Sequence, residues 1–424
     1  MLKKKLLVGI FFLLATLVFN EFTVASLGSG DGTLELPNII LIRLIDGVLL
    51  GAGIALLVFR VRVSLNVILF NAVFLLLLLL LIEGGLFYLV HRTNPVLGNA
   101  PLHGIKRELY NAYKRVIQYD AECAQHDEFL GYTLKPGACT FSGQEFANGF
   151  QVNQRGYRDD EDSLKSPSII VLGDSYAMGW GVEQEESFAQ RLESTSGKTV
   201  LNAAISSFGT ARQVLSLERL DTTKLEALVF QYCHNDYEEN EAFAEAGGTL
   251  KTMNAKRYDR TAESYERNRE YYIGKYLLHL FRVRGRAAHG AITRAIARWY
   301  ELPLQAPVTA KEEATVFLEA LGHSKVDLSQ VRIVVLELGP CTMMDSVFVD
   351  ALREESSKKD QGDDALDVEI LDVSAFLTEE HYYPLDGHIH SEGHRVVAEE
   401  LLKLLEQDSA TQSPSVGAAG GNPR

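Results

Sequence analysis

Short apolar runs alternate with helical patterns over the second half of the chain, and this alternation is the strongest constraint on its fold. The runs are Ile169–Leu172, Val200–Ala203, Ala227–Tyr232, Val331–Leu336 and Val368–Leu371. Ile169–Leu172 is continuous, which is typical of a strand buried on both faces, and the others are similar runs, some with one polar interruption. Amphipathic patterns predict helices over 188–194, 212–220, 312–321, 342–355 and 393–405. The alternation predicts an α/β domain with a parallel sheet covered by helices on both faces.

The first ninety residues instead hold three apolar blocks, at about 6–19, 38–59 and 63–90. The second and third approach or exceed the ~20 residues that a helix needs to cross a bilayer. The third contains an unbroken leucine run, Leu75–Leu81. The first follows the lysines Lys3–Lys5 and predicts either a cleavable signal peptide or a short membrane anchor. We therefore expect N-terminal transmembrane helices within residues 1–92.

Basic residues around these blocks predict the orientation of the chain in the membrane. Lys3–Lys5 precede the first block, and Arg60 and Arg62 separate the second from the third. The loop between the first two blocks, 21–37, has no Lys or Arg. Because short basic segments stay on the cytoplasmic side, the chain after the third block is expected outside. This predicts a multi-pass protein of a bacterial inner membrane, with its main domain on the periplasmic or extracellular side.

The remaining chain divides by composition into three parts. Residues 93–165 carry many turn signals and predict an irregular or short-stranded connecting segment. Residues 166–406 hold the sheet domain, with a helical insertion at about 238–310, and the tail 407–424 is expected to be disordered. The middle of the insertion is basic, although the chain has a net charge of −15. It is either a lid that binds an anionic glycan or lipid headgroups, or a helical surface with a solvated basic face.

Four cysteines in an exported domain allow disulfide bonds. Cys123 and Cys139 flank one loop-like segment and are the expected pair. Cys233 and Cys341 each follow an apolar run and are expected to be buried free thiols. No C-x-x-C motif or Cys/His cluster indicates a metal site, so no metal is expected.

Three short polar segments mark the predicted functional site: Gly173–Ser175, His234–Asp236 and Asp386–His388. The first two follow predicted strands, and ligands bind beyond the carboxyl ends of parallel strands. Ser175 is the candidate nucleophile, and a serine needs a base in contact with it. His388 is the candidate base, since Asp386 lies two residues earlier and can hold one of its ring nitrogens. His381, His390 and His394 are competing candidates.

A site for acyl chemistry also needs donors for an oxyanion. The side-chain amide of Asn235 is one candidate, although a bracing role in its loop is the alternative. The backbone N–H of Ser175 is a second candidate. The third is the backbone N–H of Ser207, in the loop 202–210 that follows the second predicted strand.

Gly-Asp-Ser, the loop 202–210, His-Asn-Asp and Asp-Gly-His resemble blocks I, II, III and V of the SGNH (GDSL-like) hydrolases, over about 168–406. The resemblance implies a flavodoxin-like three-layer α/β/α fold, a Ser175 nucleophile, an Asp386–His388 dyad and an Asn235 oxyanion donor. The chain departs from the family where Ser207 replaces the block II glycine. Its Asp-x-His spacing is similar to that of membrane-anchored members and of the sugar O-acetyltransferase branch.

A further motif, Asn153-x-x-Gly156-x-Arg158, resembles one found in membrane-anchored members. The sequence does not reveal what this motif does.

These features predict a serine-dependent acyl ester hydrolase that acts on an acylated glycan or lipid of the cell envelope. One alternative is an O-acyltransferase that modifies an envelope polysaccharide with the same dyad. The other is a non-catalytic module that binds glycan. The expected partners are the substrate and the membrane, with no nucleic acid and no cofactor.

Overall fold

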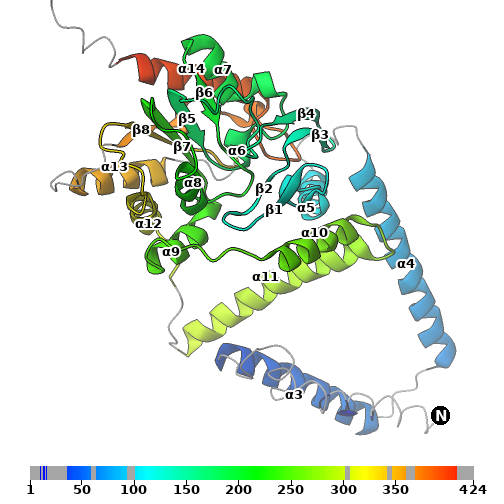
Figure 1. Ribbon diagram of the computed structural model, residues 1–424. Coiled ribbons are helices and arrows are strands. Elements are labelled where there is room, and N and C mark those ends of the chain that lie inside the picture. The colour runs from blue at the N-terminus through cyan, green and yellow to red at the C-terminus, as the bar shows by residue number, and fades with distance from the viewer. Residues whose placement is uncertain are drawn as a thin grey trace, which may run out of the picture. The chain divides into compact units, whose positions relative to one another are not determined.

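A computed structural model describes residues 36–58, 64–92, 101–300, 306–340, 346–359 and 368–407, together with residues 10, 13, 14 and 16 (Figure 1). The chain divides into two compact units. The first contains 1–92 and 271–307, and the second contains 93–270 and 308–424. Most of the predicted first apolar block, and all of the predicted tail except Gln407, lie outside the described residues.

A five-stranded parallel sheet forms the centre of the second unit (Figure 1). The strands are β5 (Ile169–Leu172), β6 (Val200–Asn202), β7 (Ala227–Tyr232), β8 (Arg332–Glu337) and β9 (Val368–Leu371). They lie in the order β6-β5-β7-β8-β9. This is the flavodoxin-like strand order. The chain adds its second strand on one side of β5 and the later strands on the other side, so the strand order reverses between β5 and β7. The predicted parallel α/β sheet is confirmed, with each predicted strand within one residue of its observed ends.

Helices cover both faces of the sheet, and alternate strand residues contact each layer. Ile169 and Val171 lie in one apolar cluster with α7 (Phe188–Ser196) and α14 (Ser391–Gln407). Ile170 and Leu172 lie in the other. The helices on that second side are α8 (Thr210–Leu217), α12 (Ala310–Gly322) and α13 (Val347–Lys359). Because successive strand side chains point to opposite faces, the two clusters define a three-layer arrangement.

From residue 101 onward, the connecting segment contains one α-helix, one 3₁₀ helix and two antiparallel strand pairs. They are α5 (Pro101–Tyr113), η1 (Ile117–Tyr119), β1 (Ala124–Asp127), β2 (Gly131–Leu134), β3 (Gly137–Ser142) and β4 (Ala147–Val152). The expected short strands are present, but the sequence analysis did not predict α5. Its amphipathic pattern spans only thirteen residues.

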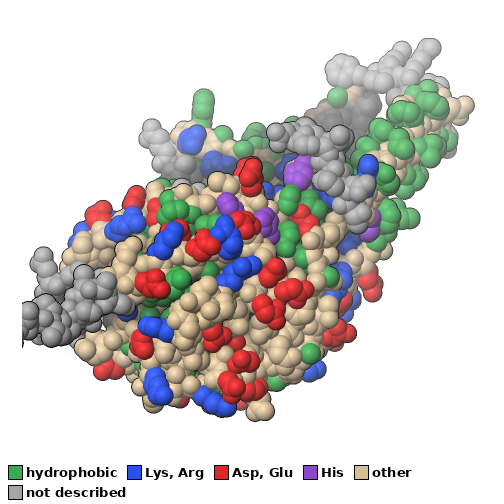
Figure 2. Space-filling view, turned by 90° about the horizontal axis from the view of Figure 1, so that it is seen from above, with side chains coloured by type: hydrophobic (Ala, Val, Ile, Leu, Met, Phe, Trp, Pro, Cys, Tyr) green, Lys and Arg blue, Asp and Glu red, His purple; other side chains and the backbone are tan. Residues whose placement is uncertain are grey.

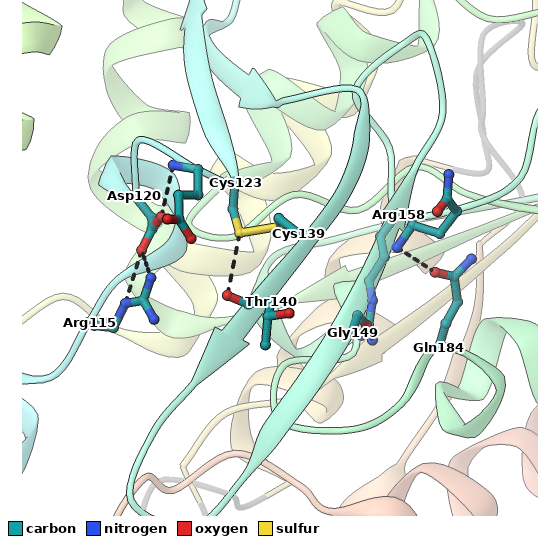
Figure 3. The surroundings of a disulfide bond; sticks show 10 residues. Arg115, Asp120, Cys123, Cys139, Thr140, Gly149, Arg158 and Gln184 are labelled. Atoms are coloured by element: carbon teal, nitrogen blue, oxygen red, sulfur yellow. Dashed lines mark hydrogen bonds and ion pairs between the residues drawn. A yellow bond between two sulfur atoms is a disulfide. The ribbon is translucent and has the colours of Figure 1, made fainter.

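A disulfide joins Cys123, just before β1, to Cys139 on β3, as predicted (Figure 3). Beside it, Arg115 forms an ion pair with Asp120. Cys233 is a buried free thiol, as expected. Cys341 lies outside the described residues.

The predicted insertion forms three helices that belong to different units. The helices α9 (Tyr237–Glu245) and α10 (Ala255–Arg269) belong to the second unit. The third, α11 (Lys275–Trp299), belongs to the first unit and contacts α3 (Leu36–Val58) and α4 (Leu65–His91) there. The insertion is therefore not one surface element of the sheet domain.

Within the described residues, one helix is long and apolar enough to cross a membrane, Asn66–His91 in α4. Its apolar side chains are largely exposed, and Figure 2 shows apolar side chains gathered at the upper right. Elsewhere on the face that Figure 2 shows, acidic and basic side chains are interspersed. The multi-pass topology and the orientation of the chain stay predictions.

Candidate active site

Ser175 lies at the carboxyl end of β5, where the chain turns directly into the short helix α6 (Ser175–Met178). Asp174 precedes it, and its carboxylate accepts a hydrogen bond from the backbone N–H of Tyr176. Gly173 makes the turn possible because a Cβ there would lie 2.6 Å from both Ala177 Cβ and Gln231 Oε1. The tight turn places the Ser175 hydroxyl at the rim of the sheet, beside the reversal between β5 and β7.

The side chains of Ser175, His388 and Asp386 form one hydrogen-bonded chain. Ser175 Oγ lies 2.7 Å from His388 Nε2. His388 Nδ1 bonds Asp386 Oδ1. Gly387, between the two, has a φ of +87°, a backbone conformation that favours glycine. The chain thus presents one ring nitrogen to the hydroxyl and the other to a carboxylate, as a serine nucleophile and its base require.

Two aromatic rings fix the orientation of the His388 imidazole. The Trp180 ring stacks on it, with 4.9 Å between centroids and 15° between planes. The Tyr176 ring lies 4.5 Å away, and its hydroxyl donates to the Gly387 carbonyl. Both aromatic residues follow Ser175 within five positions, so the segment that carries the hydroxyl also holds the base.

The other three histidines make different contacts. His394 is fully buried, and its Nδ1 accepts from the Phe188 backbone N–H. Burial lowers the pKa of His394 to about 3, so this ring is neutral. His390 Nε2 bonds the Glu380 carbonyl, and His381 Nδ1 accepts from Thr378 N, at the start of the 3₁₀ helix η6 (Glu379–His381). Among the four candidates, the described contacts join His388 to Ser175.

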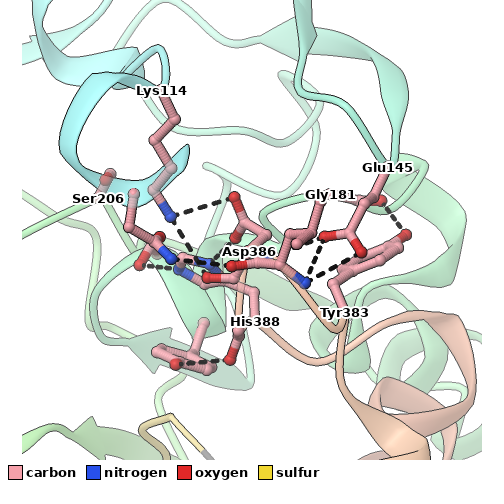
Figure 4. Close-up of polar contacts among 12 residues, drawn as sticks. Lys114, Glu145, Gly181, Ser206, Tyr383, Asp386 and His388 are labelled. Carbon is pink, nitrogen blue, oxygen red and sulfur yellow. Dashed lines mark hydrogen bonds and ion pairs between the residues drawn. The ribbon is translucent and has the colours of Figure 1, made fainter. Parts of the chain in front are cut away.

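The connecting segment holds the carboxylate of Asp386 from the side opposite His388 (Figure 4). Lys114 Nζ lies 3.1 Å from Asp386 Oδ2, and the Tyr110 hydroxyl donates to the same oxygen at 3.2 Å. Glu145 accepts from the backbone N–H groups of Leu385 and Asp386. Sequence reasoning missed these three residues, because they lie more than 200 positions from Asp386 and no local pattern marks them.

The charges in this cluster favour an ionised Asp386, and burial favours a neutral His388. Burial alone would raise the pKa of Asp386, but His388 and Lys114 outweigh it and hold that pKa well below its usual range. Burial lowers the pKa of His388, the Asp386 carboxylate opposes that shift, and Lys114 adds to it. A neutral imidazole is the form that can accept a proton from Ser175.

Ser207 lies in the loop after β6 with a φ of +60°, the left-handed region that L-residues seldom adopt. Its hydroxyl accepts from Gln118 Nε2 at 3.0 Å, and Gln118 Oε1 accepts from the neighbouring Ser206 hydroxyl. The Tyr132 hydroxyl donates to the carbonyls of Ser206 and Ser207. The connecting segment therefore holds Ser207 in a conformation that a glycine would adopt without strain.

Asn235 lies in the 3₁₀ helix η3 (His234–Asp236), directly after β7, and its side chain is exposed. β7 pairs with β5, so Asn235 and Ser175 follow neighbouring strands at the same edge of the sheet. The next residue, Asp236, is buried, and its carboxylate accepts from the Cys233 backbone N–H. The roles of Asn235 and of the Ser207 N–H as oxyanion donors stay predictions.

Arg158 gives a structural role to the Asn153–Arg158 motif. Its buried guanidinium donates to the carbonyls of Gly179 and Val182, in the segment that follows Ser175, and to the Gly149 carbonyl on β4. It also lies 3.8 Å from the centroid of the Phe150 ring. Burial lowers the pKa of Arg158 to about 10, so the group stays charged. Arg158, labelled in Figure 3, thus ties the connecting segment to the loop after Ser175.

The rest of this motif builds the turn that presents Arg158. Asn153 Oδ1 accepts from the backbone N–H groups of Arg155 and Tyr157. Gly156 has a φ of +84°, and a Cβ there would lie 2.9 Å from the Leu134 carbonyl oxygen. Asparagine and glycine at this spacing are therefore required by a local turn.

The described residues hold no group of three or more His, Cys, Asp or Glu side chains that could bind a metal ion. Two further 3₁₀ helices in the described part of the domain, η2 (Gln184–Glu186) and η5 (Val373–Ala375), contribute no side chain to the hydrogen-bonded chain of Ser175, His388 and Asp386.

Comparison with known proteins gives limited information. No protein-family model matches the chain, and no curated protein is similar to it. Among solved structures, a lipolytic G-D-S-L family member from Veillonella parvula is 10% identical, with 56% of this chain and 98% of that chain covered, at a TM-score of 0.32. The psychrotrophic esterase EstA from Pseudoalteromonas sp. is 12% identical, with 57% and 98% covered, at 0.30. Likenesses this weak carry no argument, so the function is inferred from the chain's own contacts.

Replacing Lys114 with methionine is expected to change the pH dependence of any Ser175-dependent reaction. Without the cation, the pKa of His388 rises, so the acid limb of kcat/KM moves to higher pH. Lys114→Arg keeps the charge and is expected to leave the limb near its wild-type position. An unmoved acid limb in Lys114→Met would show that the ion pair with Asp386 does not influence the base.

Two substitutions at Ser207 separate backbone strain from the hydroxyl contact. Both Ser207→Gly and Ser207→Ala lose the hydrogen bond from Gln118, but only glycine adopts a φ of +60° without strain. Glycine is expected to be more stable than alanine by about 1 kcal/mol. Urea unfolding of the two variants measures this difference. Equal stability would mean that this position carries no backbone strain.

Proposed function

We propose that this chain is a serine-dependent acyl ester hydrolase. The observation that carries the proposal is the hydrogen-bonded chain from Asp386 through His388 to Ser175, with 2.7 Å between Ser175 Oγ and His388 Nε2. That distance is within the reach required for direct proton transfer between a nucleophile and its base. The site lies at the carboxyl edge of a parallel sheet, where ligands bind in such folds.

The geometry supports a two-step acyl transfer. Ser175 Oγ attacks the carbonyl carbon of the ester while His388 Nε2 accepts the hydroxyl proton. The carbonyl oxygen becomes an oxyanion, for which the backbone N–H groups of Ser175 and Ser207 and the Asn235 amide are the proposed donors. When the C–O bond breaks, His388 returns the proton to the leaving alcohol. A water molecule then attacks the acyl-enzyme with His388 again as base, releasing the acid and restoring Ser175.

Asp386 keeps its negative charge throughout this cycle. The pKa of Asp386 lies below its usual range because His388 and Lys114 outweigh the effect of burial. A carboxylate in this state accepts the Nδ1–H of His388, which leaves Nε2 free for the serine proton, and stabilises the imidazolium that forms. Lys114, Tyr110 and Glu145 are positioning residues, since they act through Asp386 and its backbone.

We further propose that the domain acts outside a bacterial inner membrane, on an acylated glycan or lipid of the cell envelope. The apolar helix Asn66–His91 in α4 supports a membrane anchor before the domain. The disulfide between Cys123 and Cys139 fits an oxidising compartment. The basic residues beside the predicted spans fit an outer location for everything that follows α4.

Hydrolysis of an aryl acetate ester by the full chain in detergent tests the proposal. Ser175→Ala is expected to lower kcat/KM by at least about 10³-fold, because it removes the nucleophile. Asp386→Asn is expected to lower it by about 10³–10⁴-fold, and Asn235→Ala by about 10²–10³-fold. His390→Gln is the matched control, because His390 bonds the Glu380 carbonyl instead of the Ser175 chain. Wild-type rates in Ser175→Ala would exclude the proposal.

The same assay distinguishes hydrolysis from transfer when a labelled acyl donor and an envelope polysaccharide are both present. Release of labelled free acid identifies a hydrolase. Label on the polysaccharide identifies an O-acyltransferase that uses the same three residues. No turnover with either acceptor, together with binding of the glycan, would indicate a non-catalytic module.

A further inference from the structure

A stripe of exposed apolar side chains runs along α11, in the first unit. Leu278, Phe281, Ile292 and Trp299 are 45%, 64%, 43% and 84% exposed. Positions 278, 281, 285, 288, 292, 296 and 299 follow one another at steps of three and four residues. Residues at these steps lie on one face of a helix. The large apolar side chains lie toward the two ends of this face, with Gly285 and Ala288 between them, and the face is called the α11 stripe.

The α11 stripe points away from the protein neighbours of the helix. Tyr276 and Ala297 are buried in α11, where the helix contacts α3 and α4. At about 100° per residue, Trp299 is rotated about 200° from Ala297. One face of α11 thus packs inside the first unit, and the opposite face exposes apolar side chains.

Basic side chains accompany the α11 stripe, and acidic ones do not. The helix contains no Asp or Glu and carries five exposed arginines, Arg282, Arg284, Arg286, Arg294 and Arg298, whereas its one lysine, Lys275, is buried. Viewed along the helix axis, Arg282 lies about 100° from Phe281 in one direction, and Arg284 lies about 60° from it in the other. A chain with a net charge of −15 therefore presents a purely cationic, apolar-striped surface here. This combination matches an anionic bilayer surface, because lipids offer both phosphate groups and acyl chains.

A buried carboxylate ties the start of α11 to α4. Glu83, on α4, is 2% exposed. It accepts from the backbone N–H of Tyr276 at 3.2 Å and of Leu277 at 2.9 Å. These two N–H groups belong to the first turn of α11, where the helix itself has no carbonyl group to accept their hydrogen bonds. A carboxylate is favoured at this end by the helix dipole.

Glu83 is the first charged residue along α4, although apolar residues follow it and the candidate span continues to His91. The stretch Leu65–Ile82 has 18 residues, so as a helix it is about 27 Å long, close to the ~30 Å of a bilayer core. The start of α11 is therefore held near one end of a span that begins at Leu65. The Tyr271 ring, which contacts Phe87 with 4.6 Å between centroids, lies just before α11. Tyr and Trp are enriched at the ends of membrane spans.

We propose that α11 is an interfacial helix that lies on the outer surface of the membrane that α4 crosses. Its apolar stripe inserts between lipid headgroups, and its arginines bind the phosphates of anionic phospholipids. The proposal rests on α4 as a membrane span and goes beyond the ester chemistry. It also resolves the two interpretations of the basic insertion in favour of a lipid surface. Basic residues set the orientation of a membrane protein only where they lie in short loops or close to the end of a span. α11 begins far along the chain from the end of α4, so its positive charge does not argue against a location outside the membrane.

Trp299 provides a native reporter for this contact. The chain has two tryptophans, and the other, Trp180, is 3% exposed beside His388. The full chain is placed in nanodiscs that contain brominated phosphatidylcholine, with or without phosphatidylglycerol. We expect bromine to quench a blue-shifted component of the emission when phosphatidylglycerol is present. Trp299→Phe is expected to remove that component and leave the emission of Trp180.

Removing charge tests the role of the arginines. Replacing Arg282, Arg284 and Arg298 with glutamine is expected to weaken binding of the helix to the anionic surface by about fivefold per residue, roughly a hundredfold in total. The quenched fraction of Trp299 would then need more phosphatidylglycerol to reach the wild-type level. The matched control replaces Arg257, Arg260 and Arg267 on α10, which changes the net charge equally.

Three results would overturn the proposal. One is a Trp299 emission that bromine does not quench in anionic nanodiscs. Another is quenching of equal extent with and without phosphatidylglycerol. The third is an equal effect of the α10 and α11 substitutions, which would indicate a general effect of charge. Reaction of Ser175 with a fluorophosphonate, measured in each variant, shows whether the sheet domain is folded. The test of membrane binding by α11 can therefore fail while the ester chemistry is upheld, and the reverse is also true.

Discussion

The ion pair between Lys114 and Asp386 is the contact on which the rest of the site depends. Asp386 must stay charged while it is buried, and burial alone would favour its protonated form. Lys114, together with hydrogen bonds from Tyr110 and to Glu145, fixes the carboxylate and its backbone from the connecting segment. Asp386 then orients His388 toward Ser175. Ser175 follows strand β5 and His388 lies in the turn before α14, but residues before the sheet orient Asp386 and, through it, His388.

The same segment fixes the two loops that flank Ser175. Gln118 and the Tyr132 hydroxyl bind the Ser206–Ser207 peptide, and Arg158 binds the carbonyls that follow α6. Each contact joins residues far apart in the chain. The Cys123–Cys139 disulfide links the two parts of the segment from which these side chains come. The segment between α4 and the sheet therefore contributes to the candidate active site rather than acting as a spacer.

Whether the sequence predicted a feature depended on how far apart in the chain the interacting residues lie. The strand Ile169–Leu172 was predicted with its observed ends, because burial on both faces leaves an unbroken apolar run. Ala227–Tyr232 and Val368–Leu371 were also predicted with their observed ends, although Gln231 and Glu369 interrupt their apolar runs. Ser175, Asp386 and His388 were found because each lies in a short motif at a strand end or turn. Lys114 and Gln118 were missed, since contacts across 272 and 89 positions leave no local pattern. The contacts that hold Ser207 in a glycine-like conformation are equally invisible without coordinates.

Covalent labelling of the full chain with a fluorophosphonate, followed by mass-spectrometric mapping of the adduct, tests the central claim most directly. The account predicts one adduct, on Ser175, that is absent in Ser175→Ala. It also predicts a labelling rate that falls as the pH drops below the ordinary imidazole pKa, because burial lowers the pKa of His388. An adduct on a different serine, or equal labelling of wild type and Ser175→Ala, would contradict the claim that His388 and Asp386 activate Ser175.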